Sequence, residues 1–370
     1  MIRILHTADL HLDAAFPELG EKEGKRRLDL LQTFERLLTL AIKNDVQLFI
    51  VAGDLFDTPR PTSEIVEQVA AGFKRLIARG IAVILLPGDH DAPPDGVNAK
   101  LAALGAVILP ETPGLQPVTM TVAGRPVHFY AFGGCALPTP ATLDRMARRP
   151  LDGVHIGVLH GLRPVLSGES GQGLPLESLQ EWNLDYLAFG HGHEFLLVEG
   201  DGRLYGCCPG SPEGLRFGEN GPRYCALAEV EPENIRLEPL PVGGRVLDEL
   251  CLDLTGCETL ADAVTRIREL HSSDLLLHLT LTGLVEVPLE MAELHDRCAV
   301  DFYHLELLDR TELLAGDFVS RLASEETVRG VLARRARRLL DEVPPERRPL
   351  VEEAFRETLR RFQGQGGARA

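Results

Sequence analysis

Short apolar segments alternate with longer amphipathic ones through the first part of the chain. Ile2–His6, Gln47–Ala52 and Ile81–Leu86 are rich in β-branched and other apolar side chains, as in strands that are buried on both faces. Between them, Lys22–Lys43 and Ser63–Arg79 repeat apolar residues at helical spacing. This alternation predicts a βαβαβ unit of parallel strands, in which the residues that follow each strand share one edge of the sheet.

The pattern changes after Pro110. The strands expected there are Val118–Val122, Val127–Phe132, Gly153–Leu159 and Leu184–Phe189, followed by Phe195–Gly206, Arg223–Glu229 and Asn234–Leu240 as an antiparallel finish. A helix is expected at Ala141–Arg148. Val242-Gly243-Gly244 then marks the end of a first domain, residues 1–244.

The rest of the chain has a different organisation. Residues 245–320 predict a small α+β domain, with strands at Asp248–Leu254, Leu275–Leu281 and Val300–Leu307 and helices at Leu260–Leu270 and Leu289–Asp296. Residues 321–363 contain two helical segments, Glu325–Glu342 and Pro349–Phe362, separated by Pro344-Pro345. We expect the Gly-rich residues 364–370 to be disordered.

The net charge of the chain limits the classes of molecule that it is expected to bind. The 370 residues carry a net charge of −17, which argues against a general nucleic-acid binder because phosphate binding draws on Lys and Arg. The distribution is uneven: residues 321–370 hold 12 basic and 8 acidic side chains, a balance of +4, which leaves −21 for residues 1–320. The arginines at 334, 335, 337 and 338 in this segment are expected to form either a solvated helix face or a docking surface.

The sequence also bears on the cellular compartment. No apolar stretch is long enough to cross a bilayer, and the N-terminus reaches the acidic Asp9 without the apolar core of a signal peptide. The seven cysteines include no CxxC pair and are expected to be reduced thiols. We therefore expect a cytoplasmic protein.

Five short motifs rich in Asp and His follow the apolar segments. They are Asp9-Leu10-His11, Gly53-Asp54-Leu55-Phe56-Asp57, Gly88-Asp89-His90-Asp91, His160-Gly161 and Gly190-His191-Gly192-His193. Carboxylate and imidazole donors without Cys suit Mn(II), Fe(II) or Zn(II). Because loops after neighbouring strands meet at one sheet edge, the motifs predict a two-metal phosphoesterase site. Isolated histidines are expected to be structural instead, namely His6, His128, His155, His271, His278, His295 and His304.

The motif set resembles the calcineurin-like metallophosphoesterase superfamily. The segment from His6 to Asp13, HTADLHLD, is similar to the DNA-repair exonuclease branch of that superfamily, the SbcD and YhaO type. The resemblance rests on motifs over residues 1–240 and on domain order beyond them. It implies a four-layer α/β/β/α sandwich, followed by a small α+β capping domain that guides DNA and C-terminal helices that dock a partner ATPase.

The resemblance also assigns the ligands. It implies that one metal is held by Asp9, His11 and His193 and the other by Asp89, His160 and His191, with Asp54 bridging both. Where this chain has Asp89, family members usually have Asn. A second carboxylate on that metal should bind it more tightly but reduce its Lewis acidity, so we expect lower turnover.

Four further residues have candidate roles. His90 occupies the position of the family's catalytic His, which would stabilise the transition state or protonate the leaving oxygen. Asp57 and Asp91 are expected either to orient His ligands or to cap helices. Arg216 is a candidate phosphate contact in substrate binding.

The leading hypothesis is a DNA nuclease, an exonuclease on ends or an endonuclease on single strands, with Mn(II) as the preferred ion. Its expected partners are DNA, a second copy of the chain and an SMC-like ABC ATPase with a coiled coil, which would supply the positive DNA track that this acidic subunit lacks. A small-substrate phosphodiesterase or phosphatase is the alternative, although GDLFD lacks the GDxVDRG form of protein phosphatases. A weakly active, metal-bound regulatory subunit is a third possibility.

Overall fold

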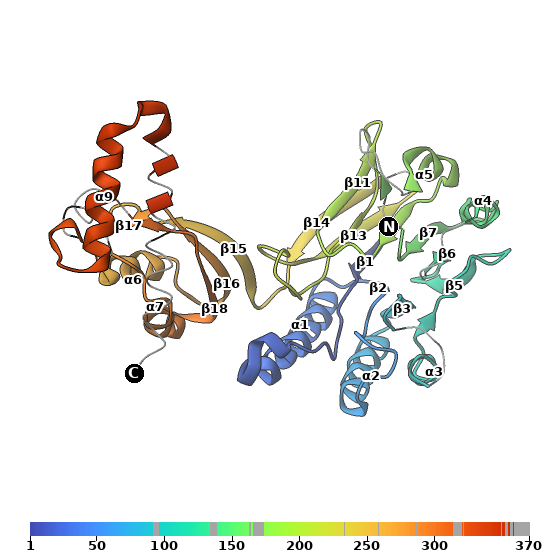
Figure 1. Ribbon diagram of the computed structural model, residues 1–370. Helices are drawn as coiled ribbons and strands as arrows, with labels where there is room; N and C mark the ends of the chain where they lie inside the picture. Colours follow the sequence, from blue (N-terminus) through green and yellow to red (C-terminus); the bar gives the residue numbers. More distant parts are fainter. Residues whose placement is uncertain are drawn as a thin grey trace. The chain divides into compact units, whose positions relative to one another are not determined.

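The computed structural model of the protein describes residues 1–91, 96–133, 139–162, 164–165, 174–232, 234–257, 259–285, 287–313, 320, 322–348, 350–351, 354–355 and 358. The chain forms two compact units, Met1–Leu247 and Asp248–Ala370 (Figure 1). Among the described helices, none has both the length and the apolar character that a membrane span requires.

The first unit contains two six-stranded sheets. The first sheet has the order β14-β13-β1-β2-β3-β4. Its strands are β1 (Ile2–Thr7), β2 (Leu48–Ala52), β3 (Ala82–Leu86), β4 (Val107–Ile108), β13 (Tyr224–Glu231) and β14 (Asn234–Pro241). The strands β1 to β4 are parallel, and β13 joins β1 antiparallel. The predicted parallel βαβαβ unit is therefore confirmed.

Helices α1 (Glu23–Lys43), α2 (Ser63–Ile77) and α3 (Val97–Ala103) connect these strands and lie on the same side of the sheet (Figure 1). A 3₁₀ turn at Pro17–Lys22 precedes α1. Aromatic contacts join the layers: the rings of Phe34 and Phe73 lie 5.7 Å apart, and Phe73 lies 6.1 Å from Phe49 of β2. The apolar stripe of each helix is thus the face that covers the sheet.

The second sheet has the order β11-β12-β10-β7-β6-β5. Its strands are β5 (Val118–Val122), β6 (Arg125–Phe132), β7 (Val154–Leu159), β10 (Tyr186–Phe189), β11 (Leu196–Gly200) and β12 (Arg203–Cys208). The central four strands are parallel, whereas β5 and β11 are antiparallel edges. A short pair, β8 (Pro164–Val165) and β9 (Leu174–Pro175), precedes helix α5 (Leu176–Trp182).

The helix predicted at Ala141–Arg148 is shorter than expected. It consists of α4 (Pro140–Leu143), capped by Thr139, and one 3₁₀ turn at Asp144–Met146. The helix ends because the next backbone amides bond elsewhere: Arg148 N donates to Trp182 O at 2.9 Å, and Arg149 N donates to Tyr130 Oη at 2.9 Å. Tertiary contacts therefore override the local helical pattern here.

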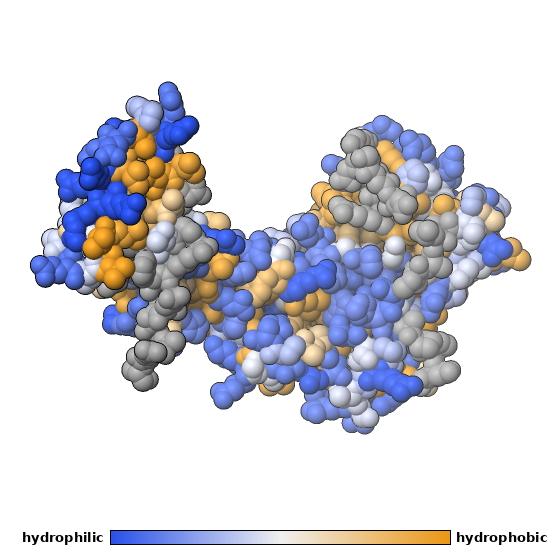
Figure 2. Space-filling model, viewed as in Figure 1, coloured by the Kyte–Doolittle hydropathy of each residue, from blue (hydrophilic) through white to orange (hydrophobic). Residues whose placement is uncertain are grey.

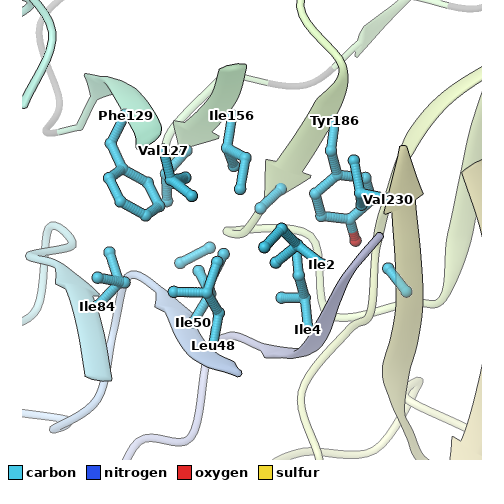
Figure 3. Packing of buried hydrophobic residues seen from close by; sticks show 14 of the residues in the cluster. Ile2, Ile4, Leu48, Ile50, Ile84, Val127, Phe129, Ile156, Tyr186 and Val230 are labelled. Carbon is cyan, nitrogen blue, oxygen red and sulfur yellow. The ribbon is translucent and has the colours of Figure 1, made fainter. Parts of the chain in front are cut away.

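The two sheets pack face to face. Figure 3 shows Ile2, Ile4, Leu48, Ile50 and Ile84 of the first sheet pointing toward Val127, Phe129, Ile156 and Tyr186 of the second. A separate cluster on the outer face of the second sheet includes Leu179 and Trp182 of α5. The layers are therefore helix, sheet, sheet and helix, as the expected α/β/β/α class requires.

The second unit has its own core. The strands β15 (Val246–Asp253), β16 (Ser272–Thr282) and β18 (Phe302–Asp309) form a sheet that packs with α6 (Leu260–Arg268) and α7 (Met291–Cys298). The smaller elements are β17 (Leu284–Val285), β19 (Glu312–Leu313) and 3₁₀ turns at Ala299–Asp301 and Pro345–Arg347. Helix α9 spans Val328–Glu342. Most of the predicted helix Pro349–Phe362, and all of residues 364–370, lie outside the described residues.

Candidate metal centre

Each of the five motifs begins where a strand of one of the two sheets ends. The first three follow β1, β2 and β3, and the last two follow β7 and β10. Because these strands are parallel within their sheets, their carboxyl ends lie on one edge of the sandwich. The structure brings all seven candidate ligands to this edge, in two groups.

The first group consists of Asp9, His11 and His193, with one ligand atom of each within 4.8 Å of the others. His11 Nδ1 lies 2.9 Å from Asp57 Oδ1, so the ring donates from Nδ1 and directs Nε2 toward the group. That Nε2 atom is buried and has no hydrogen-bond partner. A bound cation would satisfy this atom, so the residues fit a divalent metal.

The second group consists of Asp54, Asp89, His160 and His191, again within 4.8 Å. His160 Nδ1 donates to Ala52 O at 2.9 Å, and its Nε2 lies 2.8 Å from Asp89 Oδ1. His191 Nδ1 lies 3.4 Å from the same Asp89 oxygen. Imidazole and carboxylate donors therefore converge on one point, as they do around a borderline divalent ion.

The Asp54 carboxylate lies between the two groups. Its Oδ2 is 3.6 Å from His11 Nε2 and 3.3 Å from His160 Nε2. Its Oδ1 accepts a hydrogen bond of 2.9 Å from the backbone N of His90. One oxygen is therefore held by the protein, while the other faces both groups.

The ligand loops have an unusual backbone. Asp9, His11, Asp54 and His191 all have positive φ, between 44° and 75°. Such left-handed conformations cost free energy in residues other than Gly and persist where the surrounding structure fixes them. Backbone bonds from Asp9 N to Gly53 O (3.1 Å) and from His11 N to Asp54 O (3.0 Å) fix the first two loops together.

Two glycines permit this close packing. A Cβ on Gly53 would lie 1.9 Å from His160 Nδ1, and one on Gly190 would lie 1.8 Å from Ala52 O. Neither position has room for a side chain. His191 N is thereby brought to the Asp9 carboxylate, 3.0 Å from Oδ1 and 2.9 Å from Oδ2.

The charges at the site shift several pKa values. Burial raises the pKa of Asp9 to about 6. Burial also opposes the charged form of His160, but hydrogen bonds to Asp54 and Asp89 outweigh it and raise the His160 pKa to about 11. The same hydrogen bond with His160 holds the pKa of Asp89 well below its ordinary value. A proton on His160 thus balances negative charge that a cation would otherwise neutralise.

The other predicted residues have distinct positions. The His90 side chain is 46% exposed, and its ring lies 4.7 Å from that of His11. Asp57 contacts the His11 ring, as described above, a position that fits the orienting one of its two predicted roles. Arg216 is 77% exposed, with its Nε 3.2 Å from Glu219 Oε1.

Asp91 differs from both roles considered for it. It accepts hydrogen bonds from the backbone N atoms of Gly88 (2.6 Å), Leu55 (2.7 Å) and Phe56 (3.3 Å). In the described part of the chain it contacts none of the His ligands, and the α3 cap is Gly96. Asp91 therefore joins the second and third ligand loops through their backbones.

Sequence reasoning missed Glu219. Its Oε1 lies 2.7 Å from His193 Nδ1, and its Oε2 accepts from Leu215 N at 2.8 Å. Glu219 therefore orients His193 as Asp57 orients His11. It lies 26 residues from His193, in a loop of Gly and Pro without a recognisable motif, so no local pattern could have identified it.

A buried ion pair anchors the loop that carries Glu219. Arg26 of α1 is fully buried; its Nη1 lies 2.8 Å from Glu213 Oε2, and its Nη2 donates to Gly214 O at 2.6 Å. Thr33 and the backbone of Gly244 also donate to Glu213. Helix α1 thus fixes the loop from which Glu219 contacts His193.

An α/β/β/α sandwich with paired Asp and His clusters at its edge defines the metal-dependent phosphoesterase class. The sequence model of the calcineurin-like phosphoesterases matches residues 2–195, which is more than half of the chain. The protein belongs to the calcineurin-like phosphoesterase family.

Its relatives include DNA-repair proteins. The chain is 29% identical over 225 residues to the DNA double-strand break repair protein Mre11 of Saccharolobus solfataricus, covering 58% of this chain and 56% of that protein. With Haloferax volcanii Mre11 the identity is 27% over 291 residues, 76% of this chain and 62% of the relative. The chain is 24% identical over 321 residues to the uncharacterized metallophosphoesterase YhaO of Bacillus subtilis; the match covers 78% of this chain and 74% of that protein. The chain thus spans little more than half of the first relative and under two thirds of the second. The expected resemblance to this branch is confirmed.

Proposed function

We propose that this chain is a metal-dependent DNA nuclease that hydrolyses phosphodiester bonds with two divalent ions. The position of Asp54 carries the proposal, since one carboxylate oxygen faces both ligand groups at 3.3 to 3.6 Å from their histidines. A carboxylate that is shared by two neighbouring ions must lie between the two sets of ligands, as Asp54 does. The names of the relatives, which are DNA double-strand break repair proteins, support DNA as the substrate.

In this proposal Asp9, His11 and His193 hold one ion, and Asp89, His160 and His191 hold the other. We propose Mn(II) as the preferred ion, because the donor atoms are oxygen and nitrogen and none is a Cys sulfur. Fe(II) and Zn(II) also bind such donors and are the alternatives. When bound, two such ions would stabilise negative charge on the phosphate as Lewis acids and would lower the pKa of a water that attacks phosphorus.

The protein's own contribution to proton transfer is assigned to His90. Its Nδ1 lies 3.2 Å from Asp57 O, so a proton on Nδ1 donates to that carbonyl and leaves Nε2 for the substrate. The side chain is nearly half exposed beside the buried ligands. A protonated Nε2 would donate to the leaving oxygen or to a non-bridging oxygen of the phosphate.

The acidity of the chain requires help with DNA. We propose that an SMC-like ABC ATPase with a coiled coil supplies the positive track, and that the nuclease acts as a homodimer. Helix α9 is proposed as the ATPase contact. Its Arg334, Arg335, Arg337 and Arg338 accompany the exposed apolar Val328 and Val331. Figure 2 shows apolar residues among hydrophilic ones on this part of the second unit.

The test is digestion of linear double-stranded and circular single-stranded DNA in Mn(II), with and without the ATPase. We expect cleavage that the ATPase stimulates. His90→Ala should reduce the rate about 10²- to 10⁴-fold, the usual range for a general acid. His271→Ala is the matched control, since His271 is exposed in the second unit, and it should leave the rate unchanged.

The second candidate is a small-substrate phosphodiesterase. The net charge of −17 favours it, because an acidic surface is no obstacle to a small substrate. Hydrolysis of small diesters without cleavage of either DNA, even with the ATPase present, would overturn the nuclease proposal in its favour.

A further inference from the structure

A pocket of about 720 Å³ lies directly beside the ligand groups. Its lining includes the loop after β10, with the candidate ligands His191 and His193. It also includes Phe217 and Glu219, from the loop that α1 anchors. We propose that this pocket binds the nucleobase attached to the scissile phosphate, an inference that rests on the proposed nuclease function.

The position of the pocket fits a nucleoside. A phosphate between the two ligand groups lies next to His191 and His193, and the pocket begins at these two side chains. The sugar and base joined to that phosphate must therefore extend from the ions into a neighbouring space. A volume of about 720 Å³ is within the range of sites for ligands of nucleotide size.

The walls of the pocket suit a flat ring. Phe195 and Phe217 are both partly buried there, and Leu162 and Leu196 add apolar surface. Phe195 is fixed by an edge-to-face contact with Tyr224, with ring centroids 5.8 Å apart. Bases stack on aromatic side chains, whereas a bare phosphate gains nothing from them. The aromatic lining therefore favours a base over a simple phosphate monoester.

Arg216 adds a charged group at the rim. It lines the same pocket, and Glu219 holds its Nε at 3.2 Å. A guanidinium in this position is suited to a phosphate oxygen or to stacking on the base. Glu219 contacts both Arg216 and His193, so the same carboxylate orders the base pocket and one metal ligand.

The test uses DNA in which the terminal nucleotide is replaced by an abasic tetrahydrofuran. We expect the wild type to cleave intact DNA with a kcat/KM about 5- to 150-fold above the abasic substrate, the range for stacking of one base. Phe195→Leu and Phe217→Leu should remove most of this discrimination. Leu197→Ala is the control, because Leu197 neighbours Leu196 on β11, is 39% exposed and does not line the pocket.

A binding measurement separates this inference from the nuclease proposal. Deoxyadenosine monophosphate and inorganic phosphate are titrated by calorimetry into the Mn(II)-loaded protein. We expect the nucleotide to bind at least about fivefold more tightly, and the two Phe variants to lose this difference while their Mn(II) affinity is unchanged.

Each outcome bears on the inference. Equal binding of nucleotide and phosphate, or wild-type discrimination that persists in both Phe variants, would overturn the base pocket even if the protein digests DNA. Preferential nucleotide binding that depends on Phe195 and Phe217, in a protein that cleaves no DNA, would keep the pocket and reject the nuclease.

Discussion

The two ligand groups of the metal centre differ in burial and in charge. The side chains of Asp9, His11 and His193 are 0%, 3% and 18% exposed. The second group combines the buried His160 and Asp54, at 0% and 2%, with the more open Asp89 and His191, at 23% and 51%. The first group has one carboxylate of its own, and the second adds Asp89 to Asp54. In the proposed two-ion site, the more buried first group would retain its ion, and the exposed Asp89 and His191 would be the side that substrate approaches.

The residues behind the ligands differ as well. In the first group both histidines are held by carboxylates, Asp57 at 2.9 Å and Glu219 at 2.7 Å. In the second group His160 is held by a backbone carbonyl, Ala52 O. A carboxylate behind an imidazole makes it a more basic ligand. In the first group, part of the negative charge comes from carboxylates that contact the candidate ligands, namely Asp57 and Glu219. In the second group it comes from the candidate ligands Asp54 and Asp89 themselves.

The largest expected effect comes from the residue that both groups share. Asp54→Ala should lose both ions, because its carboxylate faces His11 and His160 alike. We expect at least a roughly thousandfold loss of activity, since several kcal/mol of Lewis-acid stabilisation disappears. Metal content per chain, measured after dialysis, should fall from two to near zero. His191→Ala is the comparison and should retain one ion; two retained ions in Asp54→Ala would contradict a shared ligand.

A smaller effect should be confined to the first group. Glu219→Gln keeps the shape of the side chain but removes the charge behind His193. We expect the affinity for one ion to fall about 10- to 100-fold, the usual effect of such a change, and the affinity for the other to remain. Calorimetric titration with Mn(II) resolves the two. Glu199→Gln, on the exposed side of β11, should change neither, and equal weakening of both ions by Glu219→Gln would refute the separation of the groups.

The pH dependence should also separate the groups. The pKa of Asp9 is raised to about 6, so this carboxyl takes up a proton as the pH falls through 6, and that proton competes with the first ion. The pKa of His160 is raised to about 11, so its proton opposes the second ion across the whole range from pH 5 to 8.

Below pH 6 the affinity of the first ion should therefore fall by about one further factor of ten per pH unit, whereas the second ion, which Asp9 does not hold, should lack this added step. Mn(II) titrations between pH 5 and 7.5 measure both slopes. A break at pH 6 that survives in Asp9→Asn would exclude Asp9 as its source.

The contrast between the groups also marks what the sequence could predict. The parallel strands and the convergence of the Asp and His side chains that follow them were predictable because each motif is short and directly follows an apolar segment, as Asp54 follows β2. The partner of His193 was not, because Glu219 approaches it only through the fold. The role of Asp91 was misjudged for the same reason, since its partners are backbone amides of another loop.

Elements governed by distant contacts were equally hard to predict. The helix after Thr139 ends early because Arg148 and Arg149 bond to other segments, which no local periodicity reports. The pocket beside the ligand groups is assembled mainly from the loops after β7, β10 and β12. Two of its phenylalanines, Phe195 and Phe217, are 22 residues apart in the sequence and lie in no common pattern.

The smallest expected effect tests the charge of the open group. Asp89→Asn removes one carboxylate, and we expect turnover at saturating Mn(II) to rise about two- to tenfold, because an ion with one anionic ligand fewer is a stronger Lewis acid. Its Mn(II) affinity should fall, since the Asp89 oxygen that lies 2.8 Å from His160 would become neutral. The same change in the buried group, Asp9→Asn, should lower activity instead, because both Asp9 oxygens accept from His191 N and an amide nitrogen cannot. Steady-state rates at several Mn(II) concentrations distinguish the two. A rate for Asp89→Asn at or below the parent would show that the extra carboxylate does not limit turnover.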